Sequence, residues 1–236
     1  MSGPRLLALD ASTEACSAAV RVGGETIERY EEPGSAQSER LLELAGAVMA
    51  EAGLAYAGLD AIAVGVGPGA FTGVRIGVAL AQGLAFGAGL ALLPVTTLEM
   101  LAAAATSQAA GEGAVLACLD ARMAELYWGV YRPDVLRGVE ALASPRVGSE
   151  ESLRAARPAC VRGLGRGFAA YPGLAAALGI PVEPADARRL PRAADLAWLG
   201  ELRLRAGEAL DPAAISPVYL RDKVARTEAE RAQGRP

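Results

Sequence analysis

The chain has 236 residues, a hydrophobic share of 52%, a formal net charge of −4 and no histidine. The length suits one large domain or two modest ones, and the apolar content supports a substantial core. The missing histidine excludes histidine-based catalytic triads and the commonest metal ligand, and the acidic balance argues against a dedicated nucleic-acid surface, which needs clustered cations.

The first predicted element is a hairpin in residues 6–20, LLALDASTEACSAAV. An apolar run ends at Asp10, a short polar turn follows, and a second apolar run returns. Cys16 lies in the return strand, and Cys118 and Cys160 are too far away in the sequence to share a metal-ligand spacing with it. We therefore expect buried thiols in a reducing compartment and no metal site.

Two helices are predicted next, over residues 38–52 and residues 73–86. Small residues four positions apart line one face of the second helix, which lets another backbone come close. Either this face packs against the chain's own sheet or it receives a partner helix, and composition leaves both alternatives open. The small residues are Gly73, Gly77, Ala81 and Ala85.

The apolar run of residues 76–95 approaches the length of a membrane span, about 20 residues. However, Gly87 and Gly89 break the helix before the run ends, and GLALLPV then predicts a short buried strand. The next helix, TTLEMLAAAATSQAAG, is expected to start with Thr96 or Thr97 as its cap. Because no basic cluster follows the apolar run, we expect a soluble, cytoplasmic protein.

Residues 115–130, VLACLDARMAELYWGV, repeat the first hairpin, with Asp120 in the place of Asp10. A helix over residues 190–207 is predicted for this second half, and the charged residues 225–236 are expected to be a frayed tail. The duplicated hairpin resembles the plan of the actin-like ATPase and sugar-kinase superfamily. In that superfamily two such turns grip the phosphates of ATP and its metal ion between two lobes.

Phosphate binding at these turns requires small residues after each aspartate, because backbone amides must approach the phosphate closely. Ser12 and Thr13 satisfy this requirement in the first turn. Arg122 and Met123 occupy the corresponding positions of the second turn, where Gly and Thr would be expected. The sequence therefore predicts a nucleotide clamp that is half dismantled.

Five segments, in order and over nearly the full chain, resemble the TsaB family, also called YeaZ. They are DASTEACSAAV, GVGPGAFTGVRIGVALAQGLAFG, VTTLEMLA, LDARMAELYWGVY and PVYLRDKVA. Their order makes the resemblance specific, whereas a single glycine-rich turn would be weak. Members of the family commonly have Ser where Ala70 stands, and often His near Gln37 and Ser38; neither difference is expected to abolish scaffolding.

The resemblance implies an α/β, duplicated actin-like ATPase (ribonuclease H-like) fold of two lobes, each with a mixed central sheet flanked by helices. Residues 1–104 would form the partner-binding lobe and residues 105–236 the second lobe. The implied function is that of a non-catalytic subunit, a scaffold and activator of TsaD. It is required with TsaD and TsaE to form threonylcarbamoyl on the adenosine next to the anticodon of tRNAs that read codons beginning with A.

The resemblance also implies no catalytic residues, no metal and no cofactor of its own, with ATP or ADP held in the assembled complex. The expected partners are TsaD, TsaE and, when TsaD is absent, a second copy of the chain; tRNA is contacted at most indirectly and no membrane is involved. The remnant of the nucleotide turns consists of Asp10, Ser12, Thr13 and Asp120. Arg40 and Arg75 are expected to be polar anchors at the rim of the partner interface.

By resemblance, the TsaD-binding residues lie on the two helices of the first lobe. They are Arg40, Leu41, Ala45, Val48, Phe71, Gly73, Val74, Arg75, Gly77, Val78, Ala81, Gln82 and Ala85. Three other functions are alternatives to the scaffold role. A small-molecule kinase or ATPase would use Asp10 and Asp120, a metallopeptidase is disfavoured by the absence of histidine, and a homodimeric interaction module could coexist with the scaffold role.

Overall fold

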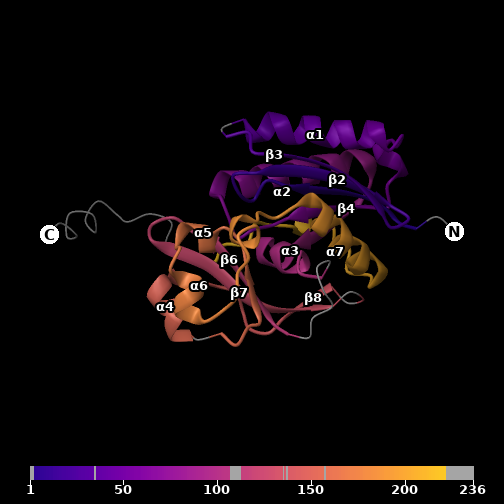
Figure 1. The fold of residues 1–236 in the computed structure, drawn as a ribbon. Coiled ribbons are helices and arrows are strands. Elements are labelled where there is room, and N and C mark those ends of the chain that lie inside the picture. The colour runs from indigo at the N-terminus through magenta and orange to yellow at the C-terminus, as the bar shows by residue number, and fades with distance from the viewer. Residues whose placement is uncertain are drawn as a thin grey trace.

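The computed structural model describes residues 3–34, 36–106, 113–134, 136, 138–156 and 158–221. In these residues two five-stranded mixed sheets organise the chain, one in each lobe (Figure 1). The first sheet has the strand order β3-β2-β1-β4-β5. Its strands are β1 (Arg5–Asp10), β2 (Cys16–Val22), β3 (Glu25–Glu31), β4 (Ala61–Gly65) and β5 (Ala91–Val95).

The second sheet has the order β10-β6-β7-β8, and β9 also pairs with β7. In both sheets the first hairpin is antiparallel and a later strand runs parallel to its first strand, β4 beside β1 and β10 beside β6. The expected duplication is therefore confirmed. The strands are β6 (Val115–Asp120), β7 (Glu125–Asp134), β8 (Gly138–Ala141), β9 (Arg146–Ser149) and β10 (Arg162–Leu164).

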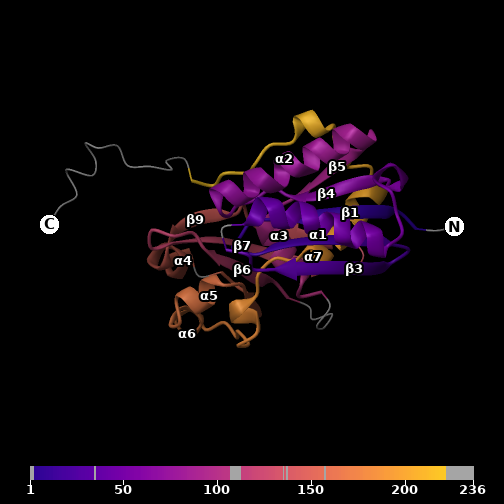
Figure 2. The same cartoon turned by 90° about the horizontal axis from the view of Figure 1, so that it is seen from above.

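Helices cover both faces of each sheet. On the first sheet, α1 and α2 share one face and α7 covers the other (Figure 2). Helix α3 lies between the two sheets, and α4, α5 and α6 cover the outer face of the second. The helices are α1 (Gln37–Glu51), α2 (Phe71–Ala88), α3 (Thr97–Ala103), α4 (Glu150–Ala156), α5 (Gly167–Ala170), α6 (Leu174–Leu178) and α7 (Ala193–Arg205), with short 3₁₀ turns at Tyr56–Gly58, Asp186–Arg188 and Pro212–Ala214.

Local signals end α2 and begin α3, but Gly87, which was predicted to break α2 together with Gly89, lies inside the helix. Gly89 is left-handed, with φ of 67°, and ends α2 at Ala88. Thr96 caps α3 in a capping box with Glu99. Of the described helices, α2 alone has the length and hydropathy of a membrane span, which is weak evidence because a helix that covers a protein core passes the same test. The predicted tail, residues 225–236, and the end of the predicted third helix, residues 107–111, lie outside the described residues.

The predicted lobe boundary at residue 104 separates the two sheets. One helix from beyond this boundary, however, packs on the sheet of the first lobe. Helix α7, which was expected in the second lobe, packs on β1 and β2 of the first sheet. Gly200 makes this possible, since a Cβ there would lie 2.8 Å from the Ala63 Cβ, and Arg21 pairs with Glu201 at 2.5 Å. Residues 206–221, which we call the strap, then run along α2 (Figure 2).

Candidate functional site

The turn between β1 and β2 contains the first predicted phosphate-binding residues. Asp10 and Ser12 are fully buried, and Asp10 Oδ1 accepts a hydrogen bond from the Ser12 amide at 3.2 Å. The Thr13 carbonyl accepts a hydrogen bond from Gln37 Nε2 at 2.5 Å. Among the described residues, Asp10 Oδ2 and Ser12 Oγ have no hydrogen-bond partner. Contacts within the described part of the chain thus hold the turn in place, and these two buried oxygen atoms are not satisfied by them.

The loop before α2 packs directly on this turn. The Ala70 amide donates to the Ser12 carbonyl at 2.8 Å. A Cβ at Gly69 would overlap that same carbonyl, and a Cβ at Gly73 would overlap the Ala11 carbonyl. These glycines are therefore required for the close approach of two backbones, and part of the surface of the first turn is covered by the chain itself.

Burial raises the pKa of Asp10 to about 6 from its ordinary value of 3.8, and the neighbouring Ser12, whose amide donates to Asp10, opposes the rise. Between these two pH values the folded chain keeps a proton that the unfolded chain has released. The contribution to stability is therefore complete below pH 4 and is lost as the pH rises through 6.

We expect the free energy of unfolding to fall by about 3 kcal/mol over this interval on account of Asp10, because one pKa unit corresponds to 1.36 kcal/mol. Urea titrations of the wild type and of Asp10→Asn at several pH values between 4 and 7 measure the difference. The wild type should lose stability relative to the variant as the pH rises. Parallel pH profiles would contradict the assignment.

The second turn, between β6 and β7, has a different structure. Arg122, Met123 and Ala124 all have positive φ, near 60°, which is a strained conformation for residues other than glycine. Asp120 Oδ1 accepts a hydrogen bond from the Arg122 amide at 2.9 Å. The Arg122 side chain extends into solvent, where its nearest carboxylate oxygen, on Asp120, lies at 3.4 Å. The turn lacks the small residues that would let amides reach a phosphate.

A cleft of about 1020 Å³ lies between the two turns. Charges of both signs line it, and some of them are paired across the lobes. Arg166, from the loop before α5, lies 2.6 Å from Glu14 and 3.3 Å from Glu32 of the first lobe. In the described part of the chain, no group of three or more His, Cys, Asp or Glu side chains could hold a metal ion. The lobes are thus joined by ion pairs in the cleft between the two turns.

Nine of the predicted partner-binding residues are buried in the core of the first lobe, and this corrects their assignment as contact residues. The stripe of small residues in α2 packs against its own sheet, because only small side chains fit against the backbone of the first turn. The buried residues are Leu41, Ala45, Val48, Gly73, Val74, Gly77, Val78, Ala81 and Ala85.

The other four predicted residues have mixed positions. Arg40 pairs with Glu31 and Glu43, and Gln82 donates to the strap carbonyls of Pro212 and Ile215. Phe71 and Arg75 are exposed. That the two helices bind a partner stays a prediction, and it now depends on the residues that these helices expose.

The outer sides of α1 and α2 carry charged residues such as Glu43 and Arg75, but a set of uncharged residues also lies on them, and we call this set the two-helix face. A Cβ at Gly46 or Gly83 would meet no atom within 4 Å, so both glycines leave open space above the helices. Leu42 is 50% exposed and Phe86 63% exposed. The two-helix face consists of Leu42, Gly46, Ala50, Ile76, Ala79, Leu80, Gly83 and Phe86.

Comparison with known proteins relates the whole chain to one family. The chain is 34% identical to the tRNA threonylcarbamoyladenosine biosynthesis protein TsaB of Escherichia coli over 226 residues, which cover 94% of this chain and 96% of that protein. The chain belongs to the TsaB family. The TsaB of Haemophilus influenzae is 33% identical, with 95% of this chain and 96% of that protein covered. The resemblance of the five sequence segments is therefore confirmed.

Comparison with solved structures identifies the same family. YeaZ from Pseudomonas aeruginosa matches this chain with a TM-score of 0.79 and 38% identity, covering 92% of this chain and all of that one. The predicted duplicated α/β fold is thus confirmed and is shared with YeaZ. A family model described as TsaD, tRNA N6-adenosine threonylcarbamoyltransferase, matches residues 31–142, which span both helices of the two-helix face. Over that region the chain is therefore similar to the TsaD family model.

Sequence reasoning missed the strap and the ion pairs of Arg166. Arg221, at the end of the strap, donates to the Ala121 carbonyl at 3.1 Å and pairs with Glu125, so it fastens the second turn. The motif PVYLR was noticed only as part of the family resemblance. A pattern within a single segment gives no sign that Tyr219 and Arg221 meet residues about 100 or more positions earlier.

Proposed function

We propose that this chain is a non-catalytic subunit of the bacterial machinery that makes threonylcarbamoyladenosine in tRNA. The observation that carries the proposal is the match over almost the full length to proteins named for this biosynthesis. In this proposal the chain acts as a scaffold and activator of a TsaD-type transferase, together with a TsaE-type protein, in the cytoplasm. The modified base is the adenosine next to the anticodon of tRNAs that read codons beginning with A.

The lack of catalysis is supported by the two turns. The loop at Gly69 covers part of the first turn, and Arg122 stands where the second would need a small residue. The chain has no histidine. The proposed subunit therefore has no cofactor of its own, and ATP or ADP binds only in the assembled complex.

Partner binding is assigned to the two-helix face. Its open space above Gly46 and Gly83 allows a helix of the partner to approach the backbone, which multiplies dispersion contacts. A set of uncharged residues with Leu42 and Phe86 exposed has the composition of an interface core. In the absence of the transferase, the same face pairs with that of a second copy. Contact with tRNA is at most indirect in this assignment.

Reconstitution tests the proposal. Purified TsaD-type and TsaE-type proteins from the same organism are incubated with tRNA, ATP and the threonylcarbamoyl donor, with and without this chain, and the modified nucleoside is quantified. We expect modification to fall to background when the chain is omitted. Full-rate modification without the chain would reject the scaffold role.

A small-molecule kinase or ATPase is the second candidate, and one observation favours it. Asp10 and Ser12 remain in the first turn, and each keeps a buried oxygen without a partner among the described residues. ATP turnover by the isolated chain, measured alongside the reconstitution, separates the two functions. We expect no turnover above that of a control in which Asp10 is replaced by Asn.

A further inference from the structure

The strap crosses from the first lobe to the second beside α2. It forms a β-bridge with β5 at Leu92 and Leu210, and the Val218 amide donates to the Val66 carbonyl at 2.7 Å. Arg221 then reaches the second turn. The strap thus brings Tyr219 to a place where the start of α2 and the second turn meet, outside the residues of the two-helix face.

An aromatic and cationic cluster lies there. The Arg75 guanidinium stacks on the Phe71 ring at 3.6 Å, and Arg75 Nε donates to the Tyr219 hydroxyl at 2.8 Å. The two ring centroids are 5.7 Å apart. Phe71 is 43% exposed and Tyr219 46% exposed. Large aromatic side chains that are held in place but left half exposed are typical of binding surfaces.

The strained second turn adds two further exposed side chains. Arg221 binds the Ala121 carbonyl and Glu125, and its guanidinium lies 3.5 Å from the Met123 sulfur. Met123 is 64% exposed, although burial would be expected for an apolar side chain of this size. Backbone strain is retained at positions where the surrounding structure enforces it, often for function. Here it directs Arg122 and Met123 outward.

We call Phe71, Arg75, Arg122, Met123 and Tyr219 the strap patch. A groove of about 180 Å³ runs beside it, with Val74, Val218 and Leu220 in its lining. In the part of the chain that the structure describes, Arg75 forms no ion pair with a carboxylate. Of the carboxylates of the second turn, Asp120 lies 3.4 Å from Arg122 and Glu125 is paired with Arg221. The strap patch is therefore a cationic and apolar surface on a chain whose net charge is −4.

We propose that the strap patch binds an acidic segment with apolar side chains from a protein partner. Carboxylates of the segment would pair with Arg75 and Arg122, and its apolar side chains would enter the groove beside Tyr219. The proposal rests on the proposed function, because the partner is sought among the proteins of the same modification machinery. It adds a second contact surface, separate from the two-helix face.

The observations favour a protein over RNA. A base would need a free aromatic face for stacking, but Arg75 already covers one face of Phe71. Val74, Val218 and Leu220 line the groove together with the rings of Phe71, Tyr127 and Tyr219. Met123, at its edge, is an apolar contact rather than a phosphate ligand. Phosphate binding also draws on more cations than the two that are available here.

The test uses the full chain with the charges of the strap patch reversed, Arg75→Glu with Arg122→Glu. Affinities for the purified TsaD-type protein, the TsaE-type protein and their mixture are measured from about 0.05 M to about 0.3 M salt. We expect the variant to bind one of these samples about tenfold or more weakly at low salt. We also expect the salt dependence seen with the wild type to be reduced.

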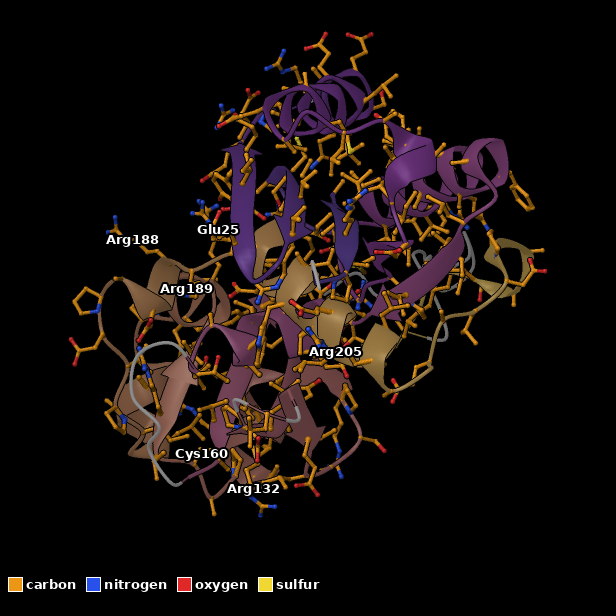
Figure 3. The ribbon with its side chains drawn as sticks, turned by 90° about the vertical axis from the view of Figure 1, so that its right-hand side faces the viewer. Glu25, Arg132, Cys160, Arg188, Arg189 and Arg205 are labelled. Atoms are coloured by element: carbon orange, nitrogen blue, oxygen red, sulfur yellow. The ribbon has the colours of Figure 1, made fainter. Side chains whose placement is uncertain are left out.

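Arg132→Glu serves as the matched control, because Arg132 is an exposed arginine of the second lobe (Figure 3) and pairs with Glu140 at the surface. It should leave all affinities unchanged. A second variant, Met123→Ser, keeps every charge and should weaken the same interaction. Unchanged melting temperatures show that the variants fold.

Three results would overturn the proposal. One is unchanged affinity of both variants for every protein sample. Another is a loss of tRNA binding by the assembled complex while the protein affinities hold. The third is tighter binding by a chain that ends at Arg221, which would make the chain's own last residues the occupant. Leu42→Glu, on the two-helix face, separates this proposal from the proposed function, because it should abolish transferase binding without changing the strap patch.

Discussion

Gly73→Ala is expected to destabilise the folded chain by about 3 kcal/mol or more, although it adds only one methyl group. The new Cβ would overlap the Ala11 carbonyl oxygen, which belongs to the backbone of the first turn and cannot rotate away. The same substitution at Gly83, in the same helix, is expected to stabilise the chain by up to about 1 kcal/mol. At Gly83 a Cβ meets open space, and alanine favours the helix.

Urea unfolding of the two variants and the wild type measures both effects, and Gly46→Ala in α1 is a second control at an open position. The essential result is that the alanine substitutions at Gly73 and Gly83 change the free energy of unfolding in opposite directions. Equal effects at Gly73 and Gly83 would mean that α2 does not pack on the first turn as described. A bulky residue at the buried Gly77 would likewise report on folding and not on partner binding.

The elements of this fold could be predicted from the sequence because their signals are local. Two apolar runs on either side of a short polar turn predicted the hairpins of residues 6–20 and 115–130, and the glycine that follows α2 predicted its end. The helix over residues 190–207 was also predicted, but its position was wrong. Its apolar side chains show that it must be covered, but they do not show which sheet covers it.

For a related reason, the sequence could not predict which side of α2 faces the sheet. Nearly every side of the helix is apolar or small, so the pattern did not single out the side that faces the sheet. The side of α2 that faces the sheet is determined by a tertiary contact, in which the backbone of the first turn packs against Gly73. The same holds for the strap patch, in which Phe71 and Tyr219 meet although 148 positions separate them. Such pairs are set by topology and leave no trace in either segment.

Leu42→Glu is expected to weaken binding to the TsaD-type transferase by about 100-fold or more, equivalent to about 2.7 kcal/mol. A carboxylate at this position would be buried without a counter-charge when a helix of the partner covers the two-helix face. In the free chain the substituted side chain remains in solvent, since Leu42 is half exposed, so the stability of the fold should change by less than about 0.5 kcal/mol.

Gly83→Arg should have the same effect on binding, because its side chain would fill the open space above α2. Val161→Glu is the matched control: it places the same charge at an exposed apolar position of the second lobe, where Val161 is 54% exposed. Calorimetric titration with the transferase measures the affinity for the partner, and sedimentation of the chain alone shows whether it forms a homodimer. Since one face serves both partners in the proposed function, Leu42→Glu should abolish any homodimer and transferase binding together. A variant that lost only one of the two would show that they use different surfaces.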